Sequence, residues 1–287
     1  MKLIKYFFQY IVILFLFIIF KFLGLKYSSI LSGYITKIFG PIFRSNKISY
    51  SNITKALPNL NDNQKNIILK KMWNNYGTIL AEYMFIKNFR TIFKYQKKIK
   101  IINKEILDKI ILNKKPVIFI SGHFNNFELM AMQIEKSGVD LAAIYRPLNN
   151  IFLNPIMEKI RKKYICKYQI KKGISGTKEL LRCFKKNVSI ALMIDQRVSE
   201  GIACKFFNKE ALTTTIPAQF VKKFNTEIIP VHIERFDGNN FTIEFSEPLK
   251  FSKDETVHDI TLQLNKVLEK MILKNPEQWI WTHNRWK

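Results

Sequence analysis

His123 and Glu128 are the residues whose types and spacing could best support catalysis. They lie directly after the apolar run Val117–Ile120, which is typical of a buried strand. A histidine works as a general base near neutral pH, and a carboxylate bonded to one ring nitrogen raises the basicity of the other. Five residues turn a helix by about 500°. The two side chains therefore meet only if His123 lies on a strand-to-helix turn and Glu128 lies in the first helical turn, with Asn125 or Asn126 as N-cap.

Such a pair is the histidine–carboxylate half of a catalytic triad, and no enzyme nucleophile accompanies it. We therefore expect the substrate to supply its own hydroxyl. The alternative is a turn histidine beside a glutamate on a solvated helix face, and spacing alone leaves it open. Ser175 and Lys178 match the S-x-x-K of serine acylases, but the companion motifs of those enzymes are missing.

No metal or redox cofactor is implied by the sequence. It contains no P-loop, no G-x-S-x-G, no H-E-x-x-H and no C-x-x-C. The three cysteines, Cys166, Cys183 and Cys204, are odd in number and far apart. This usage favours a reducing compartment.

Short β-rich runs alternate with helical patterns from about residue 97 onward. The predicted strands are Ile99–Ile102, Val117–Ile120, Leu141–Tyr145, Ser189–Ile194, Ile228–Ile233 and Phe241–Phe245. The predicted helices are Asn126–Ser137, Ile151–Tyr164, Ser175–Lys185, Ile216–Phe224 and Val257–Leu273. This order predicts an α/β fold in which helices flank a mostly parallel central sheet.

The region before residue 97 reads as helical, over Ser28–Phe43 and Asn63–Phe89, with breaks at Pro41 and Pro58. We expect a membrane anchor at 1–25, a helical membrane-associated extension at 26–96 and one α/β core at 97–287.

Tyr6–Leu25 is the clearest membrane signal. It contains ten consecutive apolar residues, Ile11 to Phe20, and about 20 residues are needed to cross the hydrocarbon. A cleaved signal peptide is the competing interpretation, but no A-x-A site follows. Lysines flank both ends, so counting charges does not fix the orientation. The large basic body favours the cytoplasmic side.

The charge balance is strongly basic. Among 287 residues, 47 Lys and Arg face 22 Asp and Glu, which gives a net charge of +25, and only eight of the basic residues are Arg. Codon drift in an AT-rich genome produces part of this excess. A field of this sign still attracts anionic lipid, acidic protein or nucleic acid. A membrane-tethered protein that binds anions or nucleic acid is therefore a second hypothesis, although it explains neither His123 nor Glu128.

The run Ser121–Glu128 resembles the HxxxxD/E motif of glycerolipid and lipid A acyltransferases. Four further matches resemble the bacterial lipid A late acyltransferases, in order along the chain: Tyr145–Asn150, Asp195–Arg197, Phe206–Phe207 together with Thr213–Pro217, and Trp279–Trp286. No Glu-Gly-Thr-Arg-like block of the phosphatidate-type enzymes is present. The resemblance covers essentially the whole chain and favours the lipid A branch, or the related mannoside acyltransferases.

The resemblance implies a glycerolipid-acyltransferase-like fold in the bacterial inner membrane, with the catalytic domain on the cytoplasmic side. It implies acyl transfer from an acyl carrier protein thioester to a hydroxyl of a lipid A precursor, with no cofactor and no nucleic acid. His123 would be the general base and Glu128 its orienting partner. The implied substrate-binding residues are Asn126, Arg146, Asp195, Gln196 and Arg197.

Several roles stay open on the sequence. Arg146 and Arg197 fit either an oxyanion or the phosphates of the acceptor, and Arg146 also fits a solvated turn. Asp195 fits a partner of Arg197 or a turn cap as well as a substrate ligand. The tryptophans of Trp279–Trp286 fit core packing or a membrane-interface belt. The acceptor could also be another glycolipid or a lysophospholipid.

Overall fold

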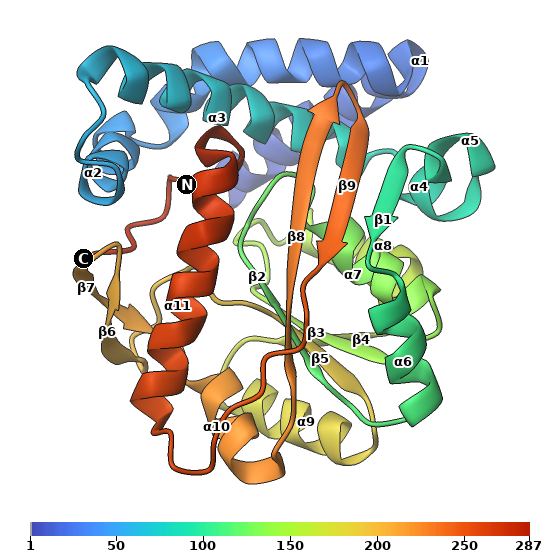
Figure 1. Cartoon of the computed structure of the whole chain (residues 1–287). Helices are drawn as coiled ribbons and strands as arrows, with labels where there is room; N and C mark the ends of the chain where they lie inside the picture. The colour runs from blue at the N-terminus through green and yellow to red at the C-terminus, as the bar shows by residue number, and fades with distance from the viewer. Residues whose placement is uncertain (1) are drawn as a thin grey trace.

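A seven-stranded sheet forms the centre of the molecule in the computed structural model, which describes residues 2–287 (Figure 1). The strand order is β1-β9-β8-β2-β5-β3-β4. These strands are β1 (Ile99–Ile102), β2 (Ile118–Ser121), β3 (Leu141–Tyr145), β4 (Tyr168–Lys171), β5 (Ser189–Met193), β8 (Ile228–Asp237) and β9 (Asn240–Phe245). All neighbours in this sheet are parallel except β8 and β9. The predicted mostly parallel α/β architecture is therefore confirmed.

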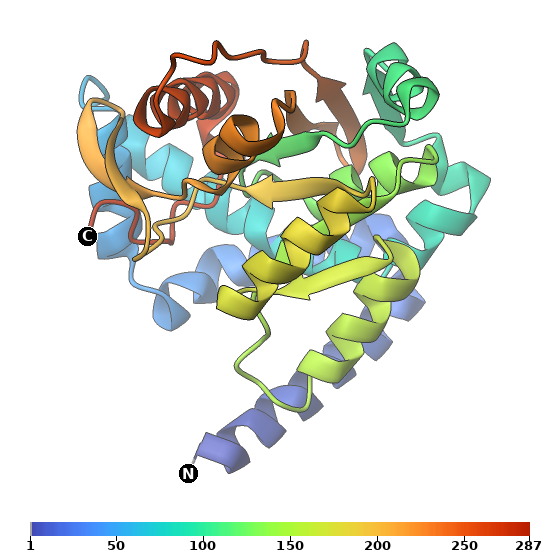
Figure 2. The same ribbon diagram turned by 90° about the horizontal axis from the view of Figure 1, so that it is seen from below.

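Helices flank the sheet and fill the chain before it. They are α1 (Lys2–Phe43), α2 (Asn46–Ala56), α3 (Asp62–Tyr83), α4 (Ile86–Thr91), α5 (Phe93–Gln96), α6 (Glu105–Asn113), α7 (Glu128–Lys136), α8 (Asn154–Tyr164), α9 (Ile174–Lys185), α10 (Ile216–Phe224) and α11 (Val257–Lys274). Helices α7 and α8 cover one face of the sheet, whereas α9, α10 and α11 lie together on the opposite side (Figure 2). A separate antiparallel hairpin joins β6 (Ile202–Phe206) to β7 (Lys209–Thr213).

The six predicted strands are all present, although β2 begins one residue late and β8 extends four residues further than expected. Strand β4, the hairpin β6–β7 and helix α6 were not predicted. Pro41 does not break a helix, because α1 continues to Phe43.

Gly24 divides α1 into two helical halves. Its φ of 72° and ψ of 172° are far from helical values, and glycine adopts a positive φ at little cost. The kink lies one residue before the end of the predicted anchor at 1–25; the functional division at residues 25 and 96 stays a prediction. After the kink, α1 packs closely on α3. A Cβ on Gly77 would lie 2.2 Å from the Ser32 carbonyl oxygen, so this crossing requires glycine.

The carboxyl ends of β2, β5 and β8 point toward α1 and α3 (Figure 1). Strand β2 is buried along its whole length, as is β8 from Ile228 to Ile233, which fits central strands with helices on both faces. Functional groups of open α/β sheets gather beyond such strand ends. The segments that follow β2 and β5 are therefore the place to look for a site.

Candidate functional site

The loop that joins β2 to α7 carries His123. The C-terminal segment fixes this loop: the Asn125 backbone N–H donates to the Gln278 carbonyl at 3.0 Å, and the Ile280 N–H donates to the His123 carbonyl at 3.2 Å. Phe124 and Trp279 form an antiparallel bridge at the same place. Residues 278–280 thus pair with the histidine loop through backbone hydrogen bonds, much as a neighbouring β-strand does.

Asp195 is the partner of His123. Its Oδ1 lies 2.8 Å from His123 Nδ1, and its Oδ2 accepts from the His123 backbone N–H at 2.9 Å. The indole Nε1 of Trp279 donates to the same Oδ2 at 2.8 Å. The Asp195 side chain is 2% exposed and that of His123 is 22% exposed. Because a carboxylate can only accept, Nδ1 of neutral His123 carries the proton and Nε2 keeps a lone pair.

The environment strengthens this base. Burial lowers the pKa of His123, but the charge and hydrogen bond of Asp195 outweigh it and raise the pKa above its usual 6.5. Burial also raises the pKa of Asp195; the His123 charge and the bonds from His123 and Trp279 overcome this and lower it to about 2. Asp195 is therefore a carboxylate at every physiological pH and keeps the ring in one tautomer.

Glu128 takes a different role from the one predicted. The Arg161 guanidinium donates to its Oε1 from Nε at 2.8 Å and from Nη2 at 2.5 Å. Among residues 2–287 no hydrogen bond joins Glu128 to His123. The expectation that Glu128 orients the ring is wrong in this geometry, because Asp195 holds the ring and α8 supplies the arginine for Glu128. The Glu128 charge still raises the pKa of His123.

Arg161 is a site residue that the sequence reasoning missed. Its side chain is 14% exposed and lies over the Tyr145 ring, with 5.6 Å from Cζ to the ring centroid. In the sequence it stands among lysines on α8 and looks like part of a solvated basic face. The available signal was that Arg161 is the one arginine in that run. The planar guanidinium of arginine binds a carboxylate better than the ammonium group of lysine does.

This arrangement can activate a hydroxyl that a substrate brings. Within the described part of the chain, no Ser, Thr or Cys hydrogen-bonds the His123 ring. The three cysteines are buried, and burial raises their thiol pKa values, that of Cys166 to about 12. This geometry lets His123 Nε2 accept a proton from a hydroxyl that a substrate brings.

Comparison with known proteins identifies the family of the chain. The sequence model of the bacterial lipid A biosynthesis acyltransferases matches residues 1–287. The chain belongs to this family. A lipid A biosynthesis acyltransferase of Haemophilus influenzae is 25% identical over 249 residues, with 84% of this chain and 76% of that protein covered. A lipid A biosynthesis lauroyltransferase of Escherichia coli is 22% identical over 252 residues, with 85% and 79% covered.

A solved structure of a 1-acyl-sn-glycerophosphate acyltransferase from Thermotoga maritima is similar at a TM-score of 0.42 and 15% identity. The match covers 96% of this chain and 99% of that one.

Two other predicted residues of this lipid A acyltransferase family member, Gln196 and Arg197, follow Asp195 just beyond the end of β5. Gln196 Nε2 is 3.5 Å from His123 Nδ1; both nitrogens carry protons in the tautomer that Asp195 holds, so this is a contact and not a hydrogen bond. The Arg197 backbone N–H donates to His283 Nε2 at 3.0 Å, and its side chain is half-buried. Arg146 is exposed. Asp195 was predicted to bind substrate, pair with Arg197 or cap a turn; it is instead the buried partner of His123.

Asn125 and Asn126 are support for the loop and do not cap α7. Phe127 occupies the N-cap position and no side chain caps the helix. Asn125 adopts a φ of 39°, which turns it away from α7. Asn126 is fully buried and donates to Glu82 at 3.3 Å. In this geometry Asn126 supports the loop, and substrate binding by Asn126 stays a prediction.

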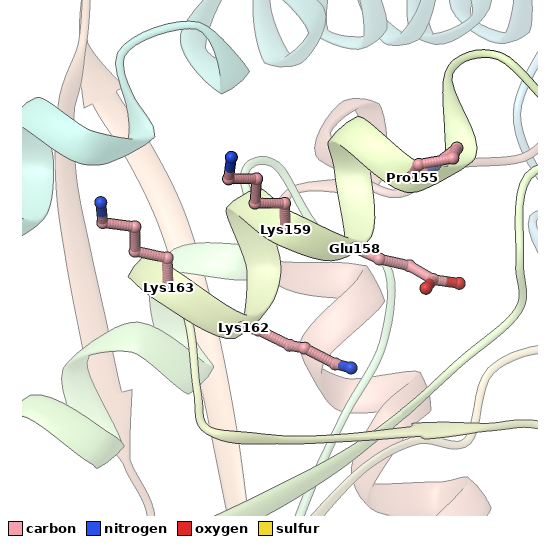
Figure 3. A pocket seen from close by; sticks show the side chains of 5 residues that line it. All are labelled: Pro155, Glu158, Lys159, Lys162 and Lys163. Atoms are coloured by element: carbon pink, nitrogen blue, oxygen red, sulfur yellow. The ribbon is translucent and has the colours of Figure 1, made fainter.

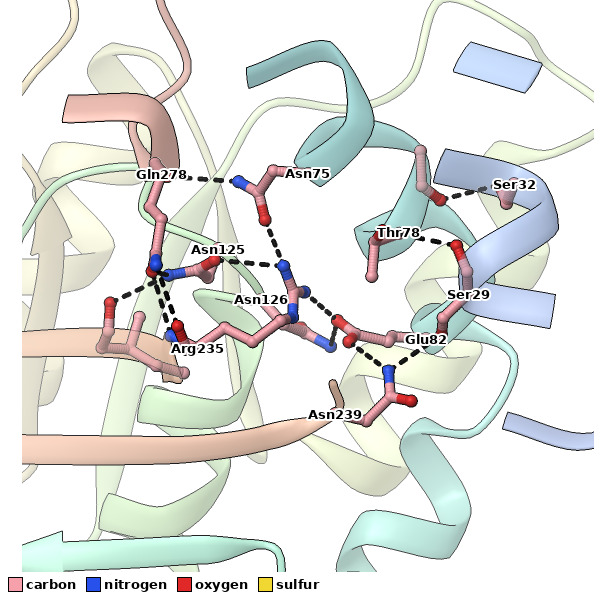
Figure 4. Close-up of polar contacts among 12 residues, drawn as sticks. Ser29, Ser32, Asn75, Thr78, Glu82, Asn125, Asn126, Arg235, Asn239 and Gln278 are labelled. Atoms are coloured by element: carbon pink, nitrogen blue, oxygen red, sulfur yellow. Dashed lines mark hydrogen bonds and ion pairs between the residues drawn. The ribbon is translucent and has the colours of Figure 1, made fainter. Parts of the chain in front are cut away.

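A buried polar network lies beneath the loop and ties it to α1 and α3 (Figure 4). Arg235 on β8 donates to Glu82 of α3 at 2.7 Å and to Asn125 at 3.2 Å. Asn239, in the β8–β9 turn, donates to Glu82 at 2.8 Å and to Ser29 of α1 at 2.9 Å. Glu82 is fully buried. The network sets the position of the histidine loop relative to the N-terminal helices.

The Trp-rich C-terminal motif is core and not an interface belt. Trp279 and Trp281 are buried, and their rings pack edge to face with centroids 4.5 Å apart. Arg285 is fully buried and donates to the Leu212 carbonyl and to Thr213, each at 2.7 Å. His232 is also buried, and burial lowers its pKa to about 4.

Two surface hollows lie away from His123. One, of about 510 Å³, is lined along α8 by Pro155, Glu158, Lys159, Lys162 and Lys163 (Figure 3). The other, of about 1030 Å³, includes Pro116 and Asn225 and lies at the amino ends of the central strands. Neither includes the loop that carries His123. No group of three or more metal-ligating side chains occurs in the described residues.

Proposed function

We propose that this chain transfers a fatty acyl chain from an acyl carrier protein thioester to a hydroxyl of a lipid A precursor. The reaction takes place on the cytoplasmic side of the bacterial inner membrane. The observation that carries the proposal is the free Nε2 of His123, in a ring whose Nδ1 is held by a buried carboxylate. A base in this state suits a weakly acidic hydroxyl at neutral pH.

In the proposed reaction, His123 Nε2 takes the proton of the acceptor hydroxyl while the hydroxyl oxygen attacks the carbonyl carbon of the thioester. The C–O bond forms, the carbonyl oxygen becomes an oxyanion, and the C–S bond then breaks. The proton moves from His123 to the departing thiolate of the carrier. A positioned base contributes about 10²–10⁴-fold to such a step. Asp195 keeps its charge and stabilises the imidazolium that forms between the two proton transfers.

Polar and charged side chains of the site would serve the oxyanion and the acceptor phosphates. Glu128 holds the guanidinium of Arg161 beside Tyr145, so Glu128 acts in part through Arg161. Arg146, Gln196 and Arg197 are the remaining candidates from the sequence. Fixed donors aimed at a developing oxyanion are often the largest contribution to catalysis.

The basic surface suits the proposed donor and membrane. With a net charge of +25, the chain would attract an acidic carrier protein and an anionic leaflet. The exposed lysines of the α8 hollow belong to this field.

An in vitro transfer assay tests the proposal. Membranes that contain the chain or its His123→Ala variant receive carrier protein loaded with acyl chains of several lengths, together with a tetra-acylated lipid A precursor. Mass spectrometry follows the acceptor. We expect one added acyl mass that disappears in His123→Ala and persists in His258→Ala, a control on exposed α11. Transfer that survives His123→Ala refutes the mechanism. No transfer with folded protein refutes the acceptor, and lysophospholipids are tested next.

A further inference from the structure

Both halves of α1 expose large apolar side chains along their outer side. Before the kink these include Ile4, Phe8, Phe15 and Phe22, and after it Ile30 and Ile42; each is between 60% and 87% exposed. We call these six residues the α1 apolar face. Water-soluble surfaces rarely leave so many large apolar groups together in contact with water. The face is long: α1 has 42 residues, which is about 60 Å of helix before the bend is counted.

The first half of α1 contacts the body of the protein at both of its ends. Near the N-terminus, Asn150 donates its side-chain amide to the Tyr6 carbonyl at 2.8 Å. The Phe152 ring packs on Phe7 at 5.6 Å between centroids. At the other end, Leu25 is buried in the core. Tyr6 and Leu25 are 19 residues apart, about 29 Å along a helix, which nearly equals the hydrocarbon thickness of about 30 Å.

These contacts conflict with a helix that crosses the bilayer. If the first half of α1 stood upright, the loop with Asn150 and Phe152 would lie near one boundary of the hydrocarbon and Leu25 near the other. The folded body between them would then be immersed in lipid. That body includes the exposed charges of Arg146 and of Lys159 on α8. A charged side chain at the bilayer centre is costly on every scale.

We propose that α1 lies along the membrane surface, with the α1 apolar face sunk into the lipid and the whole body on one side. Anionic phospholipid is the partner that this surface fits. Lys2, Lys5, Lys21 and Lys26 are exposed near the ends of the first half. Basic residues close to an anionic lipid surface strengthen binding to it.

The same geometry explains why the segment looks like a membrane span in sequence. A helix that is apolar on all sides is expected to be buried or to cross a membrane. Here Tyr10, Ile13 and Phe17 are half-buried on the inner side of α1 while the α1 apolar face points outward. The two sides meet two different apolar environments, the protein and the lipid, so α1 has no polar side left for water.

The proposal also gives the height of the site over the membrane. Ser29 of α1 bonds Asn239, Asn239 bonds Glu82, and Glu82 bonds Asn126 in the histidine loop. The carboxyl end of β2 opens toward α1 and α3 (Figure 1). A membrane-parallel α1 therefore holds His123 at a fixed, short distance from the lipid surface. This arrangement does not depend on the acceptor or the donor of the reaction.

Side-specific labelling of single cysteines tests the orientation. The full chain is placed in sealed vesicles of phosphatidylglycerol and phosphatidylethanolamine, and a membrane-impermeant maleimide is added outside. Lys5→Cys reports on the start of α1 and Lys253→Cys on the body. The native cysteines are all buried, so the unsubstituted chain gives the background. We expect both substituted positions to react from the same face. The proposal is overturned if Lys253→Cys reacts with the external maleimide while Lys5→Cys is protected and becomes labelled only after the vesicles are lysed.

Depth gives an independent measurement. A fluorescent label on Phe15→Cys is quenched by lipids that carry spin labels at different depths. A helix along the surface places it about 5–10 Å below the headgroup boundary. Strongest quenching from the bilayer centre, about 15 Å deep, refutes the proposal. Neither readout requires catalysis, so a wrong acceptor in the transfer assay leaves the result unaffected.

Discussion

Replacing Asp195 by Asn is the perturbation that most directly tests the site. In the wild type, Oδ1 accepts the Nδ1 proton of His123, and Oδ2 accepts from the His123 backbone and from Trp279. An amide has only one oxygen. If that oxygen faces the two N–H donors, the NH₂ group faces Nδ1 and forces the ring into the other tautomer. Nε2 then carries the proton and no longer accepts one.

The expected loss follows from this tautomer change. In the Ser-His-Asp triad, the same aspartate-to-asparagine change lowers kcat by about 10⁴-fold for this reason. We expect a loss of about 10³–10⁴-fold in kcat for Asp195→Asn, which is about 4–5 kcal/mol of transition-state stabilisation. The acid limb of kcat/KM also moves. The Asp195 charge raises the pKa of His123 in the wild type; without it burial dominates and the pKa falls, so the residual activity persists to lower pH.

The assay is acyl transfer from carrier protein between pH 5 and 9, with thermal melts to show that each variant is folded. Asp254→Asn, at an exposed position, is the matched control and should leave both readouts unchanged. Glu128→Gln should shift the acid limb less than Asp195→Asn, since it does not bond the ring. A loss below ten-fold, an unmoved acid limb, or a larger shift in Glu128→Gln would refute the assignment of Asp195.

Three further outcomes follow from the same contacts. Trp279→Phe removes one hydrogen bond to a charged group, so we expect an increase of about 1.5–3 kcal/mol in the activation free energy with near-normal folding; unchanged kcat contradicts it. Glu82→Ala leaves Arg235 without its buried partner, and we expect urea unfolding to show about 3–5 kcal/mol of destabilisation; a loss below 1 kcal/mol shows that the network is dispensable. Transfer rates should fall as salt rises from low to physiological ionic strength, because steering of the acidic carrier is screened; a flat profile counts against steering.

The central fold was predictable because its strands carry strong local signals. β2 and the first part of β8 are continuous apolar runs, and the patterns that separate them are helical. Strand β4 was missed because it is a four-residue edge strand, Tyr168–Lys171, with polar residues at half of its positions. The hairpin β6–β7 was missed because it lies outside the main sheet. The alternation of strand and helix patterns, which predicted the main sheet, therefore gives no signal for it. α6 has apolar residues at helical spacing in Glu105–Asn113 and could have been found.

The site was only half predictable from local sequence. His123 stands out because a histidine directly follows a buried strand, and Glu128 stands out by spacing alone. The buried network could not be anticipated, since Glu82, Arg235 and Asn239 are far apart in the chain and carry no motif. Their grouping depends on how α3 crosses the end of β8. Arg161 likewise becomes a site residue only because α8 packs beside the start of α7.

The choice between Glu128 and Asp195 turns on sheet register. β2 and β5 are parallel neighbours, and Ser121 pairs with Met193. His123 and Asp195 each stand two residues beyond this pair, just past the ends of the two strands. Parallel strands keep such positions side by side, so the ladder itself delivers the carboxylate to the histidine. Glu128 reaches the same region only after a six-residue loop, and at the start of α7 it faces α8. The spacing within the histidine motif thus predicts that the Glu128 charge lies near His123. The pairing of β2 with β5 decides that Asp195 is the carboxylate bonded to the His123 ring.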